Sequence, residues 1–175
     1  MVKETILVMG GCRSGKSSYA LELAVQISGD KKLFVATCIP YDDEKKDRVA
    51  KHKKERDKKW LTIETPIEIY NTIKEKSITM DVILIDCLTL WISNLMGKNL
   101  DDQEIFTEIQ KLILSCKEAS CSVIIVSNEV GAGIVPENSI ARRFRDIVGF
   151  ANQKVASSTN KVTWMVAGIP VPIKG

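Results

Sequence analysis

The chain contains 175 residues, 45% of them hydrophobic, which suits one domain, residues 1–175, with an ordinary core. Its net charge of +3 is too small to indicate a nucleic-acid partner, and no stretch is long and apolar enough to cross a membrane. The five cysteines form an odd set without metal-ligand spacing, so we expect free thiols in a reducing cytoplasm.

The first predicted strand, residues 5–9, leads directly into a glycine-rich turn. Residues 10–17 read Gly-Gly-Cys-Arg-Ser-Gly-Lys-Ser, which fits the phosphate-binding pattern G-x-x-x-x-G-K-[ST], and an amphipathic helix is predicted to follow. The glycines let backbone N–H groups point at phosphate oxygens, Lys16 is expected to reach the β- and γ-phosphates, and Ser17 to hold Mg²⁺. The sequence therefore predicts a nucleoside triphosphate site; the alternative is a glycine-rich turn that ends in Lys-Ser by coincidence.

A second predicted strand, residues 33–36, precedes a strongly charged segment at residues 42–59. Fifteen of these eighteen residues are charged, nine basic and six acidic, and the segment contains the only histidine, His52. On a helix, Arg48, His52 and Arg56 share one face, and the two cations favour a neutral, nucleophilic imidazole. A histidine can attack phosphorus to form a covalent intermediate. From the residues alone, a solvated surface helix remains the simpler interpretation.

Further apolar runs at residues 81–86, 122–127 and 161–166 alternate with helical patterns at 102–116 and 140–158. This alternation predicts an α/β, P-loop NTPase-like fold, with a mostly parallel sheet and helices on both faces. The C-terminal tail contains two prolines, so it is expected as an edge strand or an extended arm. Ligands of such sheets bind beyond the carboxyl ends of the strands.

Several polar residues follow these predicted strands at the same edge. Asp86 ends a hydrophobic strand, as a magnesium-orienting carboxylate does, or else it caps the helix that follows. Glu129 serves the metal or a substrate hydroxyl, or it stabilises its own turn. The arginine cluster at residues 142–145 either contacts phosphate or pairs with Asp146 and Glu137.

Several motifs occur together along the chain. They are residues 10–17, 36–37 and 42–44, then Arg48, His52, Arg56 and Trp60, residues 86–91 with Asn94, residues 128–131 with 134–136, and residues 142–146 with Gly149, Asn152 and Gln153. In this combination the chain resembles the bifunctional adenosylcobinamide kinase / adenosylcobinamide-phosphate guanylyltransferase family of cobalamin biosynthesis, nearly from end to end. The phosphate loop alone is generic, whereas the segment around His52 and the loop at residues 128–131 are specific.

The resemblance implies two reactions on one domain. In the first, the γ-phosphate of ATP or GTP passes to the aminopropanol hydroxyl of adenosylcobinamide. In the second, GTP gives its GMP portion to a histidine with release of pyrophosphate, and the GMP then moves onto adenosylcobinamide phosphate, giving adenosyl-GDP-cobinamide. The family is known for trimers, so the resemblance also implies a homo-oligomer.

Residue by residue, the guanylylated histidine of the family falls on His52, and Lys16 is the second expected catalytic residue. Metal binding is expected at Ser17 and Asp86. Nucleotide contacts carry over to Gly10, Gly11, Cys12, Arg13, Ser14, Gly15, Lys16, Ser17, Ala36, Thr37, Cys38, Lys53, Lys54, Glu55, Arg56, Glu64 and Asp86.

Two other functions compete with this one. A simple small-molecule kinase of the same fold would leave His52 without a role and release no pyrophosphate. A GTP-dependent switch protein typically reads guanine with an Asn-Lys-x-Asp element after a strand; residues 160–163, Asn-Lys-Val-Thr, lack the Asp and lie at the start of a predicted strand.

Overall fold

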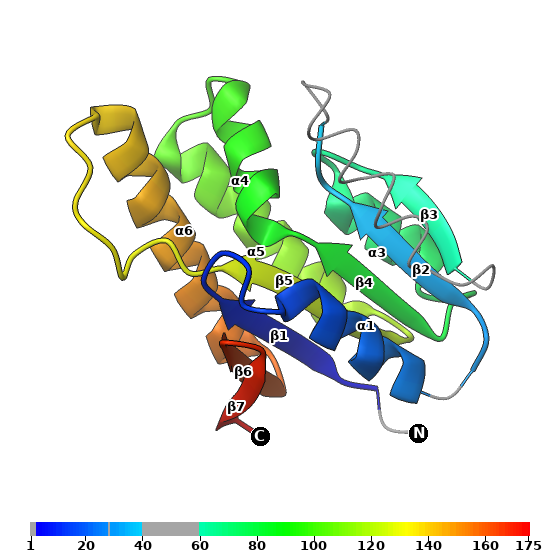
Figure 1. Ribbon diagram of the computed structural model, residues 1–175. Coiled ribbons are helices and arrows are strands. Elements are labelled where there is room, and N and C mark those ends of the chain that lie inside the picture. The colour runs from blue at the N-terminus through cyan, green and yellow to red at the C-terminus, as the bar shows by residue number, and fades with distance from the viewer. Residues whose placement is uncertain (1–2, 28, 40–59) are drawn as a thin grey trace.

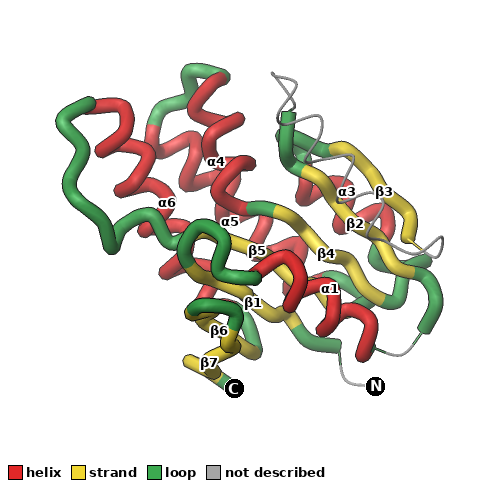
Figure 2. Tube along the Cα trace, viewed as in Figure 1, coloured by secondary structure: helices red, strands yellow, loops and turns green. Residues whose placement is uncertain are grey.

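In the computed structural model of the chain, which describes residues 3–27, 29–39 and 60–175, a seven-stranded sheet is covered by helices on both faces (Figure 1). The strands lie in the order β3-β2-β4-β5-β1-β6-β7, and all neighbours are parallel except β6 and β7. Helix α1 covers one face, and the other helices gather on the opposite face (Figure 2). The predicted fold class is confirmed.

The strands are β1 (Thr5–Gly10), β2 (Lys32–Ala36), β3 (Trp60–Glu64), β4 (Val82–Asp86), β5 (Ser122–Asn128), β6 (Lys161–Val166) and β7 (Ile169–Lys174). The helices are α1 (Lys16–Gln26), α3 (Ile69–Lys76), α4 (Leu88–Gly97), α5 (Asp102–Glu118) and α6 (Ser139–Ser158). All five strands that the sequence predicts are present, and the tail is an edge strand, antiparallel to β6. Strand β3 and helix α3 were not predicted.

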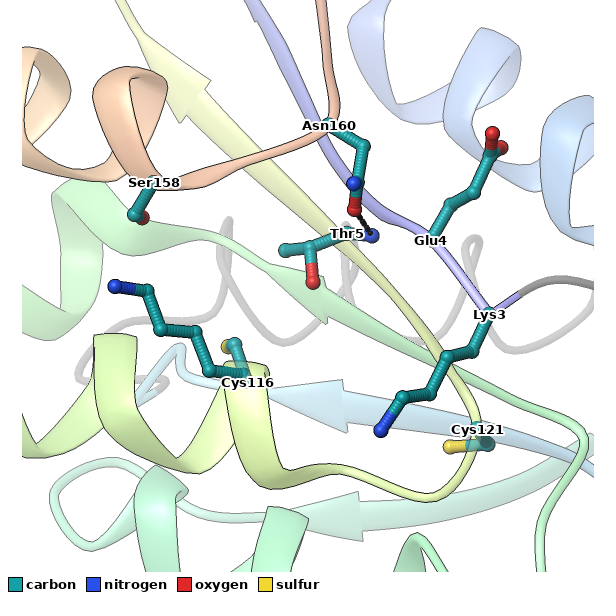
Figure 3. A pocket seen from close by; sticks show the side chains of 8 residues that line it. Lys3, Glu4, Thr5, Cys116, Cys121, Ser158 and Asn160 are labelled. Atoms are coloured by element: carbon teal, nitrogen blue, oxygen red, sulfur yellow. Dashed lines mark hydrogen bonds between the residues drawn. The ribbon is translucent and has the colours of Figure 1, made fainter.

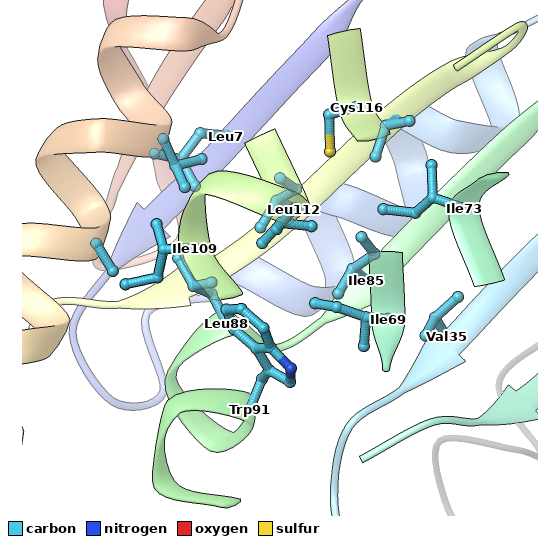
Figure 4. Packing of buried hydrophobic residues seen from close by; sticks show 14 of the residues in the cluster. Leu7, Val35, Ile69, Ile73, Ile85, Leu88, Trp91, Ile109, Leu112 and Cys116 are labelled. Atoms are coloured by element: carbon cyan, nitrogen blue, oxygen red, sulfur yellow. The ribbon is translucent and has the colours of Figure 1, made fainter. Parts of the chain in front are cut away.

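Two apolar clusters lie on the two faces of the sheet. The larger one joins the strands to α3, α4, α5 and α6 and includes Trp91 of α4, which is fully buried (Figure 4). The smaller one lies under α1, whose Ala20 and Ala24 let the helix approach the sheet closely. Strand residues alternate between the two clusters, because successive side chains of a strand point to opposite faces. No helix among the described residues is long and apolar enough to span a bilayer.

Because Cys116 is buried in the larger cluster, we expect the free energy of unfolding to fall as the pH becomes alkaline. Burial raises the pKa of this thiol from 9.0 to about 12. Between these values the folded chain holds a proton that the unfolded chain releases, so this contribution is complete below about pH 9 and is lost as the pH rises. From about pH 9 to pH 11, we expect the unfolding free energy of Cys116→Ala to fall less steeply than that of the parent, by about 1.4 kcal/mol per pH unit.

Urea unfolding across this pH range measures the slope directly. The matched control is Cys12→Ala, which removes an exposed thiol instead of a buried one. A parent and a Cys116→Ala variant with equal slopes would contradict the assignment.

Candidate active site

The phosphate loop connects β1 to α1 and has the tight backbone that its glycines predict. A Cβ atom on Gly10 would lie 2.5 Å from the Met165 carbonyl oxygen, so only glycine fits there. Gly15, the N-cap of α1, has a φ of 91°, which also favours glycine. The Gly168 N–H donates to the Ser14 carbonyl at 3.0 Å, so the β6–β7 turn supports the loop from outside.

Lys16 opens helix α1 and folds its side chain back over the loop. Its Nζ donates to the Gly11 carbonyl oxygen at 2.6 Å, and the residue is only 7% exposed. Burial lowers the pKa of Lys16, while the nearby Cys87 and Asp86 oppose that shift. The Ser14 hydroxyl in the same loop is buried and has no hydrogen-bond partner among the described residues. An orphaned donor beside a buried cation fits an anion such as a triphosphate.

Asp86 reaches the same edge of the sheet, although its strand does not touch β1. Strand β5 lies between β1 and β4, an order that the sequence did not predict. Asp86 is half-buried and close enough to Lys16 to influence its pKa. The alternative interpretation, that Asp86 caps the helix that follows, is wrong, because the N-cap of helix α4 is Cys87. A carboxylate within electrostatic reach of the phosphate-loop lysine fits the position of a magnesium-orienting residue.

Thr37, fully buried after β2, fixes the backbone beside Asp86. Its hydroxyl donates to the Cys87 carbonyl at 2.8 Å and accepts from the Cys87 N–H at 2.7 Å. Its own carbonyl accepts from Asn94 Nδ2 at 2.7 Å, and the same amide nitrogen donates to Pro66 at 3.0 Å. The ends of β2, β3 and β4 are therefore tied together by one hydroxyl and one amide.

A buried polar network fixes the end of β5, and sequence reasoning did not identify it as a unit. The Ser127 hydroxyl donates to Asn152 Oδ1 at 2.6 Å, and Asn152 Nδ2 donates to the Asn128 carbonyl at 3.2 Å. The Asn128 N–H donates to Thr89 Oγ1 at 2.8 Å. Polar residues within apolar patterns, Ser127 in a strand and Asn152 on the inner side of α6, were the available signal. The network fixes the start of the loop that follows Asn128.

Glu129 begins this loop directly beside the phosphate loop. Its N–H donates to the Gly10 carbonyl at 3.0 Å, and its carboxylate accepts from the Gly131 N–H. The contact expected of a turn-stabilising Glu129 is therefore present. Gly131 in turn accepts from Arg145 Nη2 at 2.6 Å.

The arginine cluster of α6 is engaged in contacts within the chain, and of the two predicted partners only Glu137 is contacted, through its carbonyl oxygen and not its carboxylate. Arg142 donates to the carbonyl oxygens of Pro136 and Glu137. Arg143 pairs with Asp102 of α5 at 2.7 Å, so the predicted pairing with Asp146 is not the one observed. These contacts hold both the loop and the start of α6.

The remaining predicted site residues divide into two groups. Ala36 ends β2 and is followed by Thr37 and Cys38, and Glu64 ends β3 in register with Ala36, so all four lie at the edge that carries the phosphate loop. His52, Lys53, Lys54, Glu55 and Arg56 lie outside the described residues. Within residues 3–27, 29–39 and 60–175, no three metal-ligating side chains of His, Cys, Asp or Glu converge.

The opposite edge of the sheet contains a pocket of about 220 Å³, shown in Figure 3. Its polar groups are engaged in structural contacts: Lys3 donates to the Ala119 carbonyl at the end of α5 at 2.7 Å, and Asn160 Oδ1 accepts from the Thr5 N–H at 2.8 Å. Asn160 therefore lies far from the phosphate loop, at the amino ends of the strands. A guanine-reading role for residues 160–163, as in a switch protein, does not fit this position.

Comparison with known proteins points to a nucleotide-using family, as the geometry of the candidate site does. A family model described as cobinamide kinase / cobinamide phosphate guanyltransferase matches residues 6–173. The bifunctional adenosylcobalamin biosynthesis protein CobU of Salmonella typhimurium is 40% identical, and the match covers 97% of this chain and 99% of that protein. The corresponding protein CobP of Pseudomonas aeruginosa is 38% identical, with 97% of this chain and 96% of that protein covered.

Solved structures of lower identity share the fold alone. The flagellar accessory protein FlaH of Methanocaldococcus jannaschii is 14% identical with a TM-score of 0.55, over 98% of this chain and 78% of that one. The P4 protein of bacteriophage phi6 in complex with ADP is 15% identical with a TM-score of 0.53, and the match covers 98% of this chain and 55% of that one. The identities to CobU and CobP over almost the whole length establish more: this chain belongs to the cobinamide kinase / cobinamide phosphate guanyltransferase family.

Proposed function

We propose that the chain phosphorylates adenosylcobinamide with ATP or GTP and then transfers GMP from GTP, through a guanylyl-histidine, to adenosylcobinamide phosphate. Family membership supports the pair of reactions. The observation that carries the nucleotide site is the buried Lys16 beside the unpartnered Ser14 hydroxyl, with Asp86 within electrostatic reach. One cradle serves both reactions, because each attacks a phosphorus of the same triphosphate.

In the kinase reaction, the acceptor hydroxyl attacks the γ-phosphorus and releases its proton, a new P–O bond forms, the bond to the β-phosphate oxygen breaks, and the nucleoside diphosphate leaves. Lys16 stabilises the charge that develops on the phosphate oxygens, and loop N–H groups orient them. Ser17 and Asp86 are the residues that would hold Mg²⁺, which when bound neutralises further phosphate charge. Burial of Lys16 strengthens its interaction with phosphate, since less water screens it.

In the guanylyl transfer, a neutral imidazole nitrogen of His52 attacks the α-phosphorus. A P–N bond forms, the bond to the β-phosphate oxygen breaks, and pyrophosphate leaves. An oxygen of adenosylcobinamide phosphate then attacks the same phosphorus, so the P–N bond breaks and the imidazole is regenerated. Splitting one transfer into two displacements is the usual advantage of covalent catalysis.

Loss of the histidine is the direct test of this mechanism. With GTP labelled at the α-phosphate, we expect the parent to retain acid-labile, base-stable label, whereas His52→Ala retains none and still phosphorylates adenosylcobinamide. Intact-mass measurement after exposure to GTP should give a GMP adduct on the parent alone. A His52→Ala chain that labels like the parent would exclude His52, and a parent that forms no adduct and releases no pyrophosphate would leave a simple kinase.

The guanine contacts are proposed at the ends of β2 and β3, at Ala36, Thr37, Cys38 and Glu64, together with Lys53, Lys54, Glu55 and Arg56. The described members of this set share one edge of the sheet with the phosphate loop. Since Ala36 is paired with both Asp86 and Glu64, a nucleotide on the loop would have these strand ends beside it.

We also propose that the chain acts as a homo-oligomer, a trimer by family resemblance. The β6–β7 hairpin supports this, because Val166, Ile169, Val171 and Ile173 are exposed and apolar. Val166 pairs with Ile169, and Trp164 with Val171, so these side chains lie on one face of the hairpin. An exposed apolar face of this kind is typical of a protein contact. Light scattering should give three times the chain mass of 19.5 kDa.

A further inference from the structure

The loop between β5 and α6, residues 129–138, exposes large apolar side chains to solvent. Ile134 is 97% exposed and Val135 is 62% exposed. Figure 1 shows this loop as the yellow segment that runs from the end of β5 to the start of α6. Two neighbouring β-branched side chains in water are most simply explained by a ligand or partner that covers them.

The loop is anchored at both ends, so its apolar tip is presented on a supported frame. At the β5 end, the Glu129 carboxylate holds the Gly131 N–H, and Arg145 Nη2 donates to the Gly131 carbonyl at 2.6 Å. At the α6 end, Arg142 donates to Pro136 and Glu137. Between these anchors, Ile134 and Val135 extend from the chain without being drawn into the core.

The loop is also continuous with the phosphate site. Its first residue donates a hydrogen bond to Gly10 of the phosphate loop at 3.0 Å, and β5 stands between the strands that carry Gly10 and Asp86. A molecule whose hydroxyl reaches the γ-phosphate therefore has the start of this loop, at Glu129, as a neighbour, and Ile134 and Val135 follow five and six residues further along. The phosphate loop itself offers glycines, a lysine and serines, which suit phosphate and not an apolar surface.

We propose that Ile134 and Val135 bind the macrocycle of the acceptor, an inference that rests on the proposed function. The corrin ring of adenosylcobinamide is bulky, and methyl groups line its rim, so it needs apolar contact beyond the reacting hydroxyl. The two side chains provide that contact, and burying them against the ring releases ordered water from both surfaces. The loop thus determines affinity for the acceptor and leaves nucleotide binding to the phosphate loop.

The double variant Ile134→Ser/Val135→Ser tests this assignment in the full chain. We expect the KM for adenosylcobinamide to rise about ten-fold or more, which corresponds to about 1.4 kcal/mol. The KM for GTP and the labelling of the protein by GTP alone should stay unchanged, because neither involves the acceptor. The matched control is Ile78→Ser in the turn before β4, an isoleucine whose exposed fraction of 77% lies between those of Val135 and Ile134; it should change none of these quantities.

Three outcomes overturn the inference. An unchanged acceptor KM excludes the loop, and equal rises in the KM values for acceptor and GTP indicate general disruption of the site. A change in the oligomeric mass of the double variant, measured by light scattering, assigns the two side chains to a subunit contact instead. If the parent itself does not phosphorylate adenosylcobinamide, the proposed function fails; only a parent that does so tests the loop.

Discussion

Replacing Lys16 with methionine is expected to lower the rates of phosphoryl transfer and of guanylylation by about a thousand-fold each. The buried Nζ lies 2.6 Å from the Gly11 carbonyl, inside the loop that is proposed to hold the triphosphate. No other lysine of this loop is available to take its place. Because burial already lowers the pKa of Lys16, removing the charge also removes a desolvation cost, so the thermal midpoint should not fall.

Steady-state kinetics of both reactions and thermal unfolding of the same preparation check this expectation. Lys111→Met is the matched control: Lys111 pairs with Glu108 on the surface of α5, and its loss should leave both rates unchanged. A Lys16→Met chain with near-parental rates would remove the electrostatic basis of the proposed site. A chain that loses activity only together with its folded structure would also contradict the expectation.

Replacing Thr37 with valine is expected to destabilise the fold by about 3 kcal/mol. Valine has nearly the same shape as threonine, but it leaves the buried N–H and carbonyl of Cys87 without their shared partner. Thr37→Ser is the control, because it keeps the hydroxyl and should lose much less stability. Urea unfolding measures both variants.

The same substitution should affect the site through Asp86, which precedes Cys87. We expect Thr37→Val to need more Mg²⁺ for half-maximal kinase activity than Thr37→Ser, since the backbone that positions the proposed metal ligand loses two hydrogen bonds. Valine and serine variants of equal stability and equal magnesium dependence would show that Thr37 has no positioning role.

The strands that run through the core could be predicted from the sequence, because their apolar residues form uninterrupted runs. Strand β3 was missed for a physical reason: Trp60–Glu64 lies at the edge of the sheet, is only partly buried, and follows a long charged segment. Helix α3 was missed because it has only eight residues and follows a proline. Elements at an edge bury too little surface to need a strong pattern.

The candidate site was predictable where a sequence motif fixes the backbone. It was less predictable where the contacts of a residue depend on which strands are neighbours in the sheet. The phosphate loop could be predicted from the spacing of its glycines, Lys16 and Ser17 between a strand and a helix, and the shared edge of Gly10, Ala36 and Asp86 followed from parallel strands. That β5 separates β1 from β4 could not be read, because hydrophobic runs do not encode which strand lies beside which. The contacts of Glu129 and Arg145 depend on that order, so their partners emerged only in three dimensions.

The two prolines of β7 have a consequence for how copies of this chain can associate. Residues of a strand point their N–H groups alternately to either side, and β7 is paired with β6 along its length. Pro170 and Pro172 therefore leave the free side of β7 almost without donors, so a further strand cannot be templated there. Growth of the sheet through its β7 edge is blocked, and any association at this hairpin has to use side chains, which favours a closed assembly of fixed size over an open fibre built from this edge.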